Sequence, residues 1–138
     1  MKLSVSDKVR LAVDTLNGGL KKFISNSQRS AILYALRGEE AEFFADKINA
    51  LGFMVAEEMP VTYQSDKKEP LAYLHYFMAG ADWWISEKDV EGDTPQAFGK
   101  ADLFQDGGEL GYISIDELVA SGVELDLYWT VKPLRDCE

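Results

Sequence analysis

Residues 71–87 read LAYLHYFMAGADWWISE, and this stretch decides the fold expected for the chain. Leu71–Met78 is apolar and aromatic throughout, which is typical of a strand that is buried on both faces. Ala79-Gly80-Ala81 then supplies a turn, because glycine tolerates the backbone angles of a tight reversal. A second β-like run, Asp82–Glu87, follows at once. The two runs are therefore predicted to pair as an antiparallel hairpin.

Three further strands are expected on the C-terminal side of this hairpin. Ala97–Leu103 and Leu110–Ile113 are separated by a turn signal at residues 105–108. In Val123–Val131, apolar residues alternate with Glu124, Asp126 and Tyr128, and this segment is predicted as the last strand. Between them, the capping-box spacing that begins at Ser114 predicts a short helix near residues 115–120.

The N-terminal side is predicted to be helical. Apolar residues recur at the helical step in three segments, 5–16, 27–37 and 39–51. Ser4 begins the first segment with a capping-box spacing, and Gly52 is the favoured type of C-cap for the third. We therefore expect a small helical layer at this end of the chain.

Short β-like runs at residues 53–56 and 61–63 follow this layer, with Pro60 between them. The polar residues 64–70 are predicted to form an exposed loop. Helices followed by an antiparallel meander make an α+β fold, in which the helical layer packs on a mainly antiparallel sheet.

A single domain is expected to contain all of these elements. The chain has 138 residues, of which 46% are apolar, and domains usually run to about 100–150 residues. We therefore expect one domain over residues 1–138, with a helical part at 1–52 and a strand-rich, acidic part at 53–138. No window has the roughly 18 apolar residues of a membrane helix, and the beginning lacks the apolar run of a signal peptide. The sequence predicts a soluble, cytoplasmic protein without a membrane partner.

The net charge of −10 lies entirely in the last 57 residues. Residues 82–138 carry 14 Asp and Glu against 4 Lys and Arg, whereas residues 1–81 carry 10 of each kind. Within that neutral part, residues 1–37 hold 7 basic and 2 acidic side chains. The expected molecule is electrically lopsided, and such a charge distribution steers an oppositely charged partner toward it.

Several ordered motifs in roughly residues 75–134 resemble a known family. They are His75–Glu87, Ala97-Phe98-Gly99, Asp102-Leu103, Glu109–Ser114, Glu117-Leu118 and Glu124-Leu125-Asp126. In these motifs the chain is similar to domain-of-unknown-function family 2958. Members of that family are associated with plasmids, phages and other mobile elements, so the resemblance implies a mobile-element setting. It implies no catalytic residues.

No catalytic residue, cofactor or metal site is assigned from the sequence. His75 is the sole histidine and lies among apolar and aromatic neighbours, which favours a satisfied core-edge histidine over a general base. Cys137 is the sole cysteine, so it has no intramolecular disulfide partner. The Gly107-Gly108 pair lacks the lysine and the following helix of a phosphate loop and is predicted to be a turn.

The residues around Asp89 partly resemble a calcium loop. Asp89, Glu91 and Asp93 alternate as calcium ligands do, yet Thr94 occupies the sixth position and Lys100 the twelfth. Those positions take glycine and glutamate in a calcium hand, so a solvated acidic loop is the preferred interpretation.

An interaction protein is the leading functional hypothesis. Its acidic face is expected to bind a basic host or element protein, with mimicry of nucleic acid as one form of this recognition. Adjacent Trp83 and Trp84 must face opposite sides of a strand, so one is expected in the core and the other on the acidic face or beneath a helix. The candidate binding residues are Asp82, Trp83, Trp84, Glu87, Asp89, Glu91, Asp93, Asp106 and Glu109.

Three alternatives stay open. The first is a small carboxylate-dependent hydrolase, which could be metal-assisted and would draw on Glu87, Asp102, Glu109 and Asp126. The second is direct nucleic-acid binding through the basic front end, a weaker hypothesis because the overall charge opposes it. Its residues are Lys2, Lys8, Arg10, Lys21, Lys22, Arg29 and Arg37. The third is that acidity serves only to keep the protein dispersed. The oligomeric state is left open.

Overall fold

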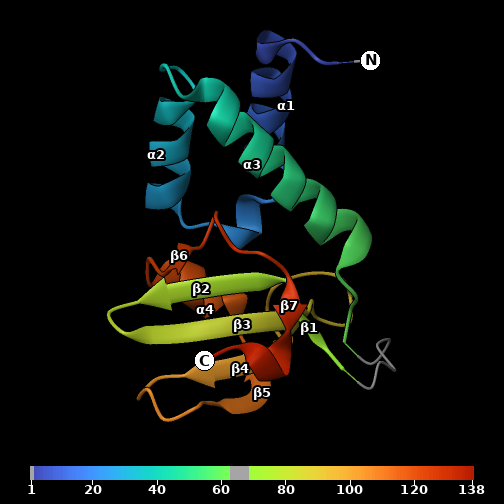
Figure 1. Ribbon diagram of the computed structural model, residues 1–138, viewed down its shortest axis with the longest axis vertical. Helices are drawn as coiled ribbons and strands as arrows, with labels where there is room; N and C mark the ends of the chain where they lie inside the picture. The colour runs from blue at the N-terminus through green and yellow to red at the C-terminus, as the bar shows by residue number, and fades with distance from the viewer. Residues whose placement is uncertain (1, 63–68) are drawn as a thin grey trace.

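The computed structural model describes residues 2–62 and 69–138 and shows an α+β fold, as predicted (Figure 1). The helices are α1 (Val5–Asn17), α2 (Asn26–Ala35), α3 (Ala41–Phe53) and α4 (Ile115–Ala120), with short turns η1 (Lys21–Phe23), η2 (Met54–Glu58) and η3 (Leu134–Asp136). The strands are β1 (Leu71–Ala72), β2 (Leu74–Met78), β3 (Ala81–Glu87), β4 (Ala97–Asp102), β5 (Glu109–Ile113), β6 (Glu124–Leu125) and β7 (Lys132–Pro133). Among the helices of these two ranges, none has both the length and the apolar character needed to cross a bilayer.

The main sheet has five strands in the order β5-β4-β3-β2-β6, and every neighbouring pair is antiparallel. The predicted hairpin forms its centre, with Met78 opposite Ala81 across the turn. The first strand of that hairpin is interrupted at Tyr73, whose N–H donates to the Ile85 carbonyl at 2.8 Å. Before the interruption, β1 pairs with β7 near the C-terminus and forms a separate two-stranded sheet.

The start of the first helix agrees with the prediction, and the end of the third helix does not. The Ser4 hydroxyl caps α1 by accepting the Asp7 N–H at 3.1 Å. Helix α3 does not end at Gly52, however, and continues through Phe53 into the π-helical turn η2. The predicted C-cap and the predicted β run at 53–56 are therefore wrong, because helical winding buries Met54 and Val55 in the core.

The predicted last strand, Val123–Val131, is also mostly absent. Only Glu124–Leu125 pairs with β2, and the Asp126 side chain then accepts the Tyr128 N–H at 2.9 Å, which turns the chain away from the sheet. At residues 61–63, Val61 forms an isolated parallel bridge with Lys88, and Tyr63 lies outside the described residues. The same holds for most of the predicted loop 64–70.

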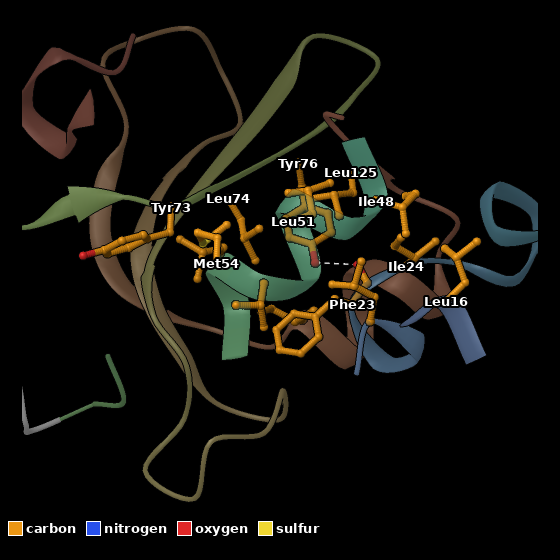
Figure 2. Packing of buried hydrophobic residues seen from close by; sticks show 14 of the residues in the cluster. Leu16, Phe23, Ile24, Ile48, Leu51, Met54, Tyr73, Leu74, Tyr76 and Leu125 are labelled. Carbon is orange, nitrogen blue, oxygen red and sulfur yellow. Dashed lines mark hydrogen bonds between the residues drawn. The ribbon is translucent and has the colours of Figure 1, made fainter. Parts of the chain in front are cut away.

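The main core lies between the helical layer and one face of the sheet, here called the inner face (Figure 2). Tyr76 stands at its centre, and its hydroxyl donates to the Phe23 carbonyl at 2.6 Å. Burial raises the pKa of Tyr76. Leu51 near the end of α3 and Met54 of η2 pack in the same cluster as Leu74 on the sheet. This cluster fixes the sheet relative to the helices.

A second, smaller cluster lies on the opposite face of the sheet, here called the outer face. Trp84 and Ala72 pack there with Leu134 and Cys137 of the C-terminal segment. Trp129 packs against this cluster and donates its indole N–H to the Ala72 carbonyl at 2.9 Å. Trp83 contacts the inner core instead, so the two adjacent tryptophans lie on opposite faces, as their alternation requires.

A candidate recognition surface on the outer face of the sheet

A row of acidic side chains crosses the outer face near the hairpin turn. Phe77 of β2 is the cross-strand partner of Glu124 on one side and of Asp82 on the other. Asp82 is in turn the partner of Asp102 on β4. Neighbouring strands lie about 4.8 Å apart, so these side chains stand in a line across four strands. We call Glu124, Phe77, Asp82 and Asp102 the carboxylate row.

The imidazole of His75 and the indoles of Trp84 and Trp129 lie next to this row. His75 is the cross-strand partner of Trp84, and their rings stack with centroids 5.6 Å apart and planes 13° from parallel. The His75 ring also stacks on Phe77 at 5.8 Å. Trp129 closes the third side, with its centroid 5.0 Å from that of the imidazole. The histidine side chain is consequently only 14% exposed.

His75 joins two carboxylates. Its Nε2 lies 2.7 Å from Asp82 Oδ1, and its Nδ1 lies 2.9 Å from Asp126 Oδ2. A neutral imidazole donates from one nitrogen, whereas the doubly protonated ring donates from both. Both nitrogens are engaged, so neither is open to a substrate. This is the satisfied core-edge histidine that the sequence favoured, and its effect is to hold Asp82 in one orientation within the carboxylate row.

The carboxylates of the row have no lysine or arginine partner among the described residues. Across residues 2–62 and 69–138, neither Glu124 nor Asp82 nor Asp102 has a Lys or Arg nitrogen within 4.0 Å, although Asp82 meets His75. Asp102 is 6% exposed, and its Oδ1 accepts the Asp106 N–H at 3.2 Å. Glu124 is exposed and Asp82 is partly exposed, so two of the three carboxylates face solvent directly.

Beside the row, Phe77 and Glu124 line a hollow of about 230 Å³ together with Met78, Ala79 and Gly122. Both Phe77 and Met78 are 39% exposed, which gives the hollow an apolar wall. Lysine and arginine bury an aliphatic stem while keeping the charged head in contact with polar groups. The hollow can therefore take one long basic side chain, with its charge directed at Glu124.

The acidic residues after β3 form a second group at the far end of that strand. Asp89 is seven positions after Asp82, which corresponds to roughly 20 Å of extended chain. Asp89 is 8% exposed, and its Oδ1 accepts the N–H groups of Glu91 at 2.9 Å and Asp93 at 2.7 Å. These bonds close the loop on itself. No three carboxylate, histidine or cysteine groups in the described part of the chain gather as a metal site would require.

Asp93 in this second group is neutralised by the helical part. Its Oδ2 lies 2.8 Å from Lys22 Nζ. The hydrogen bond from Lys22 lowers the pKa of Asp93, and the same contact raises the pKa of Lys22. A basic front-end residue thus offsets acidic charge at this end of the sheet.

The structure therefore divides the nine candidate residues. Asp82 and Trp84 lie on the outer face, and Asp106 lies in the adjoining turn, where it accepts the Gly108 N–H at 3.2 Å. Glu109 is the partner of Ala101, which places it with the inner-face positions. Trp83 is on the inner face too. The remaining four, at the far end of β3, are Glu87, Asp89, Glu91 and Asp93.

Of the four carboxylates considered for a hydrolase, Asp126 and Asp102 adjoin the linked pair His75 and Asp82 on the outer face, whereas Glu109 and Glu87 lie apart from it. Asp126 contacts His75, Asp102 faces Asp82, and Glu87 lies at the far end of β3. The surface residues that sequence reasoning missed are Phe77 and Glu124. Phe77 could have been identified from the sequence, because a turn at 79–81 places it opposite Asp82. Glu124 could not, because the pairing of β6 with β2 has no local signal.

Comparison with known proteins gives a single result. The sequence profile of the family described as "Protein of unknown function (DUF2958)" matches residues 47–134. The match includes most of α3, and so extends beyond the motifs recognised from the sequence alone. No curated protein and no solved structure matches the chain significantly. Because the profile covers more than half of the 138 residues, the chain belongs to domain-of-unknown-function family 2958.

Proposed function

We propose that this protein is an interaction protein that binds a basic partner through the carboxylate row. The observation that carries the proposal is the alignment of Glu124, Asp82 and Asp102 across adjacent strands, with no Lys or Arg ion pair from the described residues. Elsewhere in the same structure, acidic side chains such as Asp93 and Glu42 do have lysine partners. Exposed acids such as Glu91 and Glu117 also have no such ion pair among the described residues, so what distinguishes the row is that its carboxylates stand together on one face.

Asp82, at the centre of the row, is also held in place before binding. Asp82 is held by His75, and His75 is held in turn by Asp126 and by the stacked Trp84. Side chains that are already ordered lose less conformational entropy when a partner binds. Arginine and lysine form their strongest hydrogen bonds with ionised acceptors of this kind. Phe77, lying between two carboxylates, supplies apolar contact for the stem of the incoming side chain.

The partner is proposed to be a protein with a cationic surface, such as a nucleic-acid-binding groove. The mobile-element setting implied by the family resemblance supports a host or element protein as the partner. Long-range attraction by the acidic half accelerates such an encounter and makes it sensitive to salt.

The test compares two variants that have the same net charge. One is Asp82→Asn/Glu124→Gln in the carboxylate row, and the other is Glu91→Gln/Glu117→Gln at exposed positions elsewhere. Binding of a fluorescent Arg- and Lys-rich peptide is measured by anisotropy at low and at physiological salt. We expect the row variant to bind at least about tenfold more weakly and the control variant to bind as the wild type does.

Circular dichroism spectra of both variants establish that they fold. Equal weakening in the two variants means that only overall charge attracts the peptide, and it would overturn the proposal. So would full binding by the row variant.

A further inference from the structure

A pocket with a volume of about 460 Å³ lies on the outer face, between the β4–β5 hairpin and the C-terminal segment. Lys100 and Leu110, which are cross-strand partners, line it from the sheet side. Pro133 and Arg135 of the C-terminal segment line it from the other side, together with Pro70, which immediately precedes β1. Pockets of roughly 300–1,000 Å³ are typical of small-molecule sites. The size alone therefore fits a small ligand.

The charge in this pocket has the opposite sign to the rest of the acidic half. Lys100 Nζ lies over the Trp84 ring, 5.3 Å from its centroid, and has no carboxylate oxygen within 4.0 Å among residues 2–62 and 69–138. The other cation, Arg135, forms an ion pair with Glu69 and lies 3.8 Å from Asp136. Lys100 is thus the charge of the pocket that has no counterion within the described part of the chain.

The position of this ammonium group is fixed by its surroundings. Attraction between a cation and an aromatic face holds Lys100 over Trp84, which is itself only 2% exposed. The neighbouring wall is apolar, since Leu110 is 63% exposed and Pro133 lies across the pocket from it. A fixed cation beside an exposed apolar wall matches a ligand with one anionic group and an apolar body.

We propose that this pocket binds a small molecule carrying one carboxylate or phosphate group on an apolar body. Lys100 pairs with the anionic group, and Leu110 and Pro133 contact the body. The site is separate from the carboxylate row and does not depend on the proposed binding of a basic partner.

The test is an NMR titration of the ¹⁵N-labelled full chain with four probes that share a phenyl ring. Benzoate and phenyl phosphate carry the two candidate anions, benzyl alcohol is neutral, and benzylamine is cationic. We expect one or both anions to give saturable shifts at Lys100, Gly108 and Leu110. The dissociation constants for the neutral and cationic probes should be at least about tenfold higher. The preferred anion identifies the ligand class.

Two lysines provide matched variants. Lys132 Nζ also lies over an indole ring, 5.1 Å from the Trp129 centroid, but it does not line the pocket. Lys100→Met should weaken binding of the preferred anion at least about tenfold, Lys100→Arg should retain it, and Lys132→Met should leave it unchanged.

Three outcomes would overturn the proposal. They are shifts that do not saturate, equal binding of benzyl alcohol and the anions, and equal losses in Lys100→Met and Lys132→Met. The amide spectrum of each variant shows whether it is folded. Where Lys100→Met is unfolded, Lys100→Gln removes the same charge and takes its place in the comparison with Lys132→Met.

Discussion

Gly52 of α3 packs against Thr15 of α1, and an alanine there is expected to clash. A Cβ at this position would lie 2.5 Å from Thr15 Cγ2, closer than real Cβ contacts come, whereas Thr15 Cβ and Oγ1 are 3.7 and 3.8 Å away. Overpacking typically costs about 1–3 kcal/mol. Alanine also gains roughly 0.5–1 kcal/mol over glycine inside a helix. Gly52→Ala should therefore lower the free energy of unfolding by about 1–2 kcal/mol.

Thr15→Ser removes the clashing methyl group and provides the decisive comparison. The hydroxyl at this position donates to the Leu11 carbonyl at 2.9 Å, and serine retains that bond. In this background, Gly52→Ala meets only ordinary contacts and should raise the free energy of unfolding by about 0.5–1 kcal/mol. Urea unfolding of the wild type, both single variants and the double variant measures the coupling, expected at about 1–3 kcal/mol. An equal loss in both backgrounds would refute the proposed contact.

Two further predictions concern the core and the junction between the helical and strand-rich parts. Tyr76→Phe leaves the buried Phe23 carbonyl without its donor and should lower the free energy of unfolding by about 1–3 kcal/mol in urea; an unchanged value contradicts that bond. Lys22 lowers the pKa of Asp93 below 3.8, and its own pKa is raised above 10.5, so the pair stabilises the fold between these values. The difference in unfolding free energy between wild type and Lys22→Met should therefore be present at neutral pH. It should vanish as the pH falls through the lowered pKa of Asp93. A difference that persists in strong acid excludes the ion pair as its source.

The hairpin could be predicted from the sequence because its information is local. The turn at residues 79–81 lies between two β-like runs, and it sets the register that places His75 opposite Trp84. Strand alternation then puts Trp83 and Trp84 on opposite faces. The capped start of α1 is local in the same sense, since the Ser4 hydroxyl bonds an N–H three residues away.

The errors occurred where a distant contact overrides a local pattern. Residues 53–56 read as a strand, yet burial of Met54 and Val55 against the helical layer extends α3 instead. The alternation over residues 123–131 predicts a strand, but Asp126 turns the chain by bonding Tyr128 and also contacts His75, 51 residues earlier. The bond to Tyr128 is local, but the contact with His75 cannot be identified from the pattern of residues 123–131 alone.

The acidic surface shows the same limit on what composition can predict. Counting charges gives −10 for the last 57 residues but does not show which carboxylates have partners. Asp93 is paired with a lysine 71 residues away, and Asp89 binds the backbone of its own loop. Only the strand register brings Glu124, Asp82 and Asp102 into one row.

The distance between the two acidic groups decides whether Lys22 cancels the field of the carboxylate row. Lys22 binds Asp93 beyond the far end of β3, and the strand from Asp82 to Glu87 alone spans roughly 17 Å. Exposed charges are largely screened beyond a Debye length, which is about 8 Å at physiological ionic strength. Lys22 therefore offsets Asp93 beside it and has little effect at the row. A basic surface that approaches the hairpin end of the sheet experiences the local carboxylates, and Lys22 does not weaken that attraction.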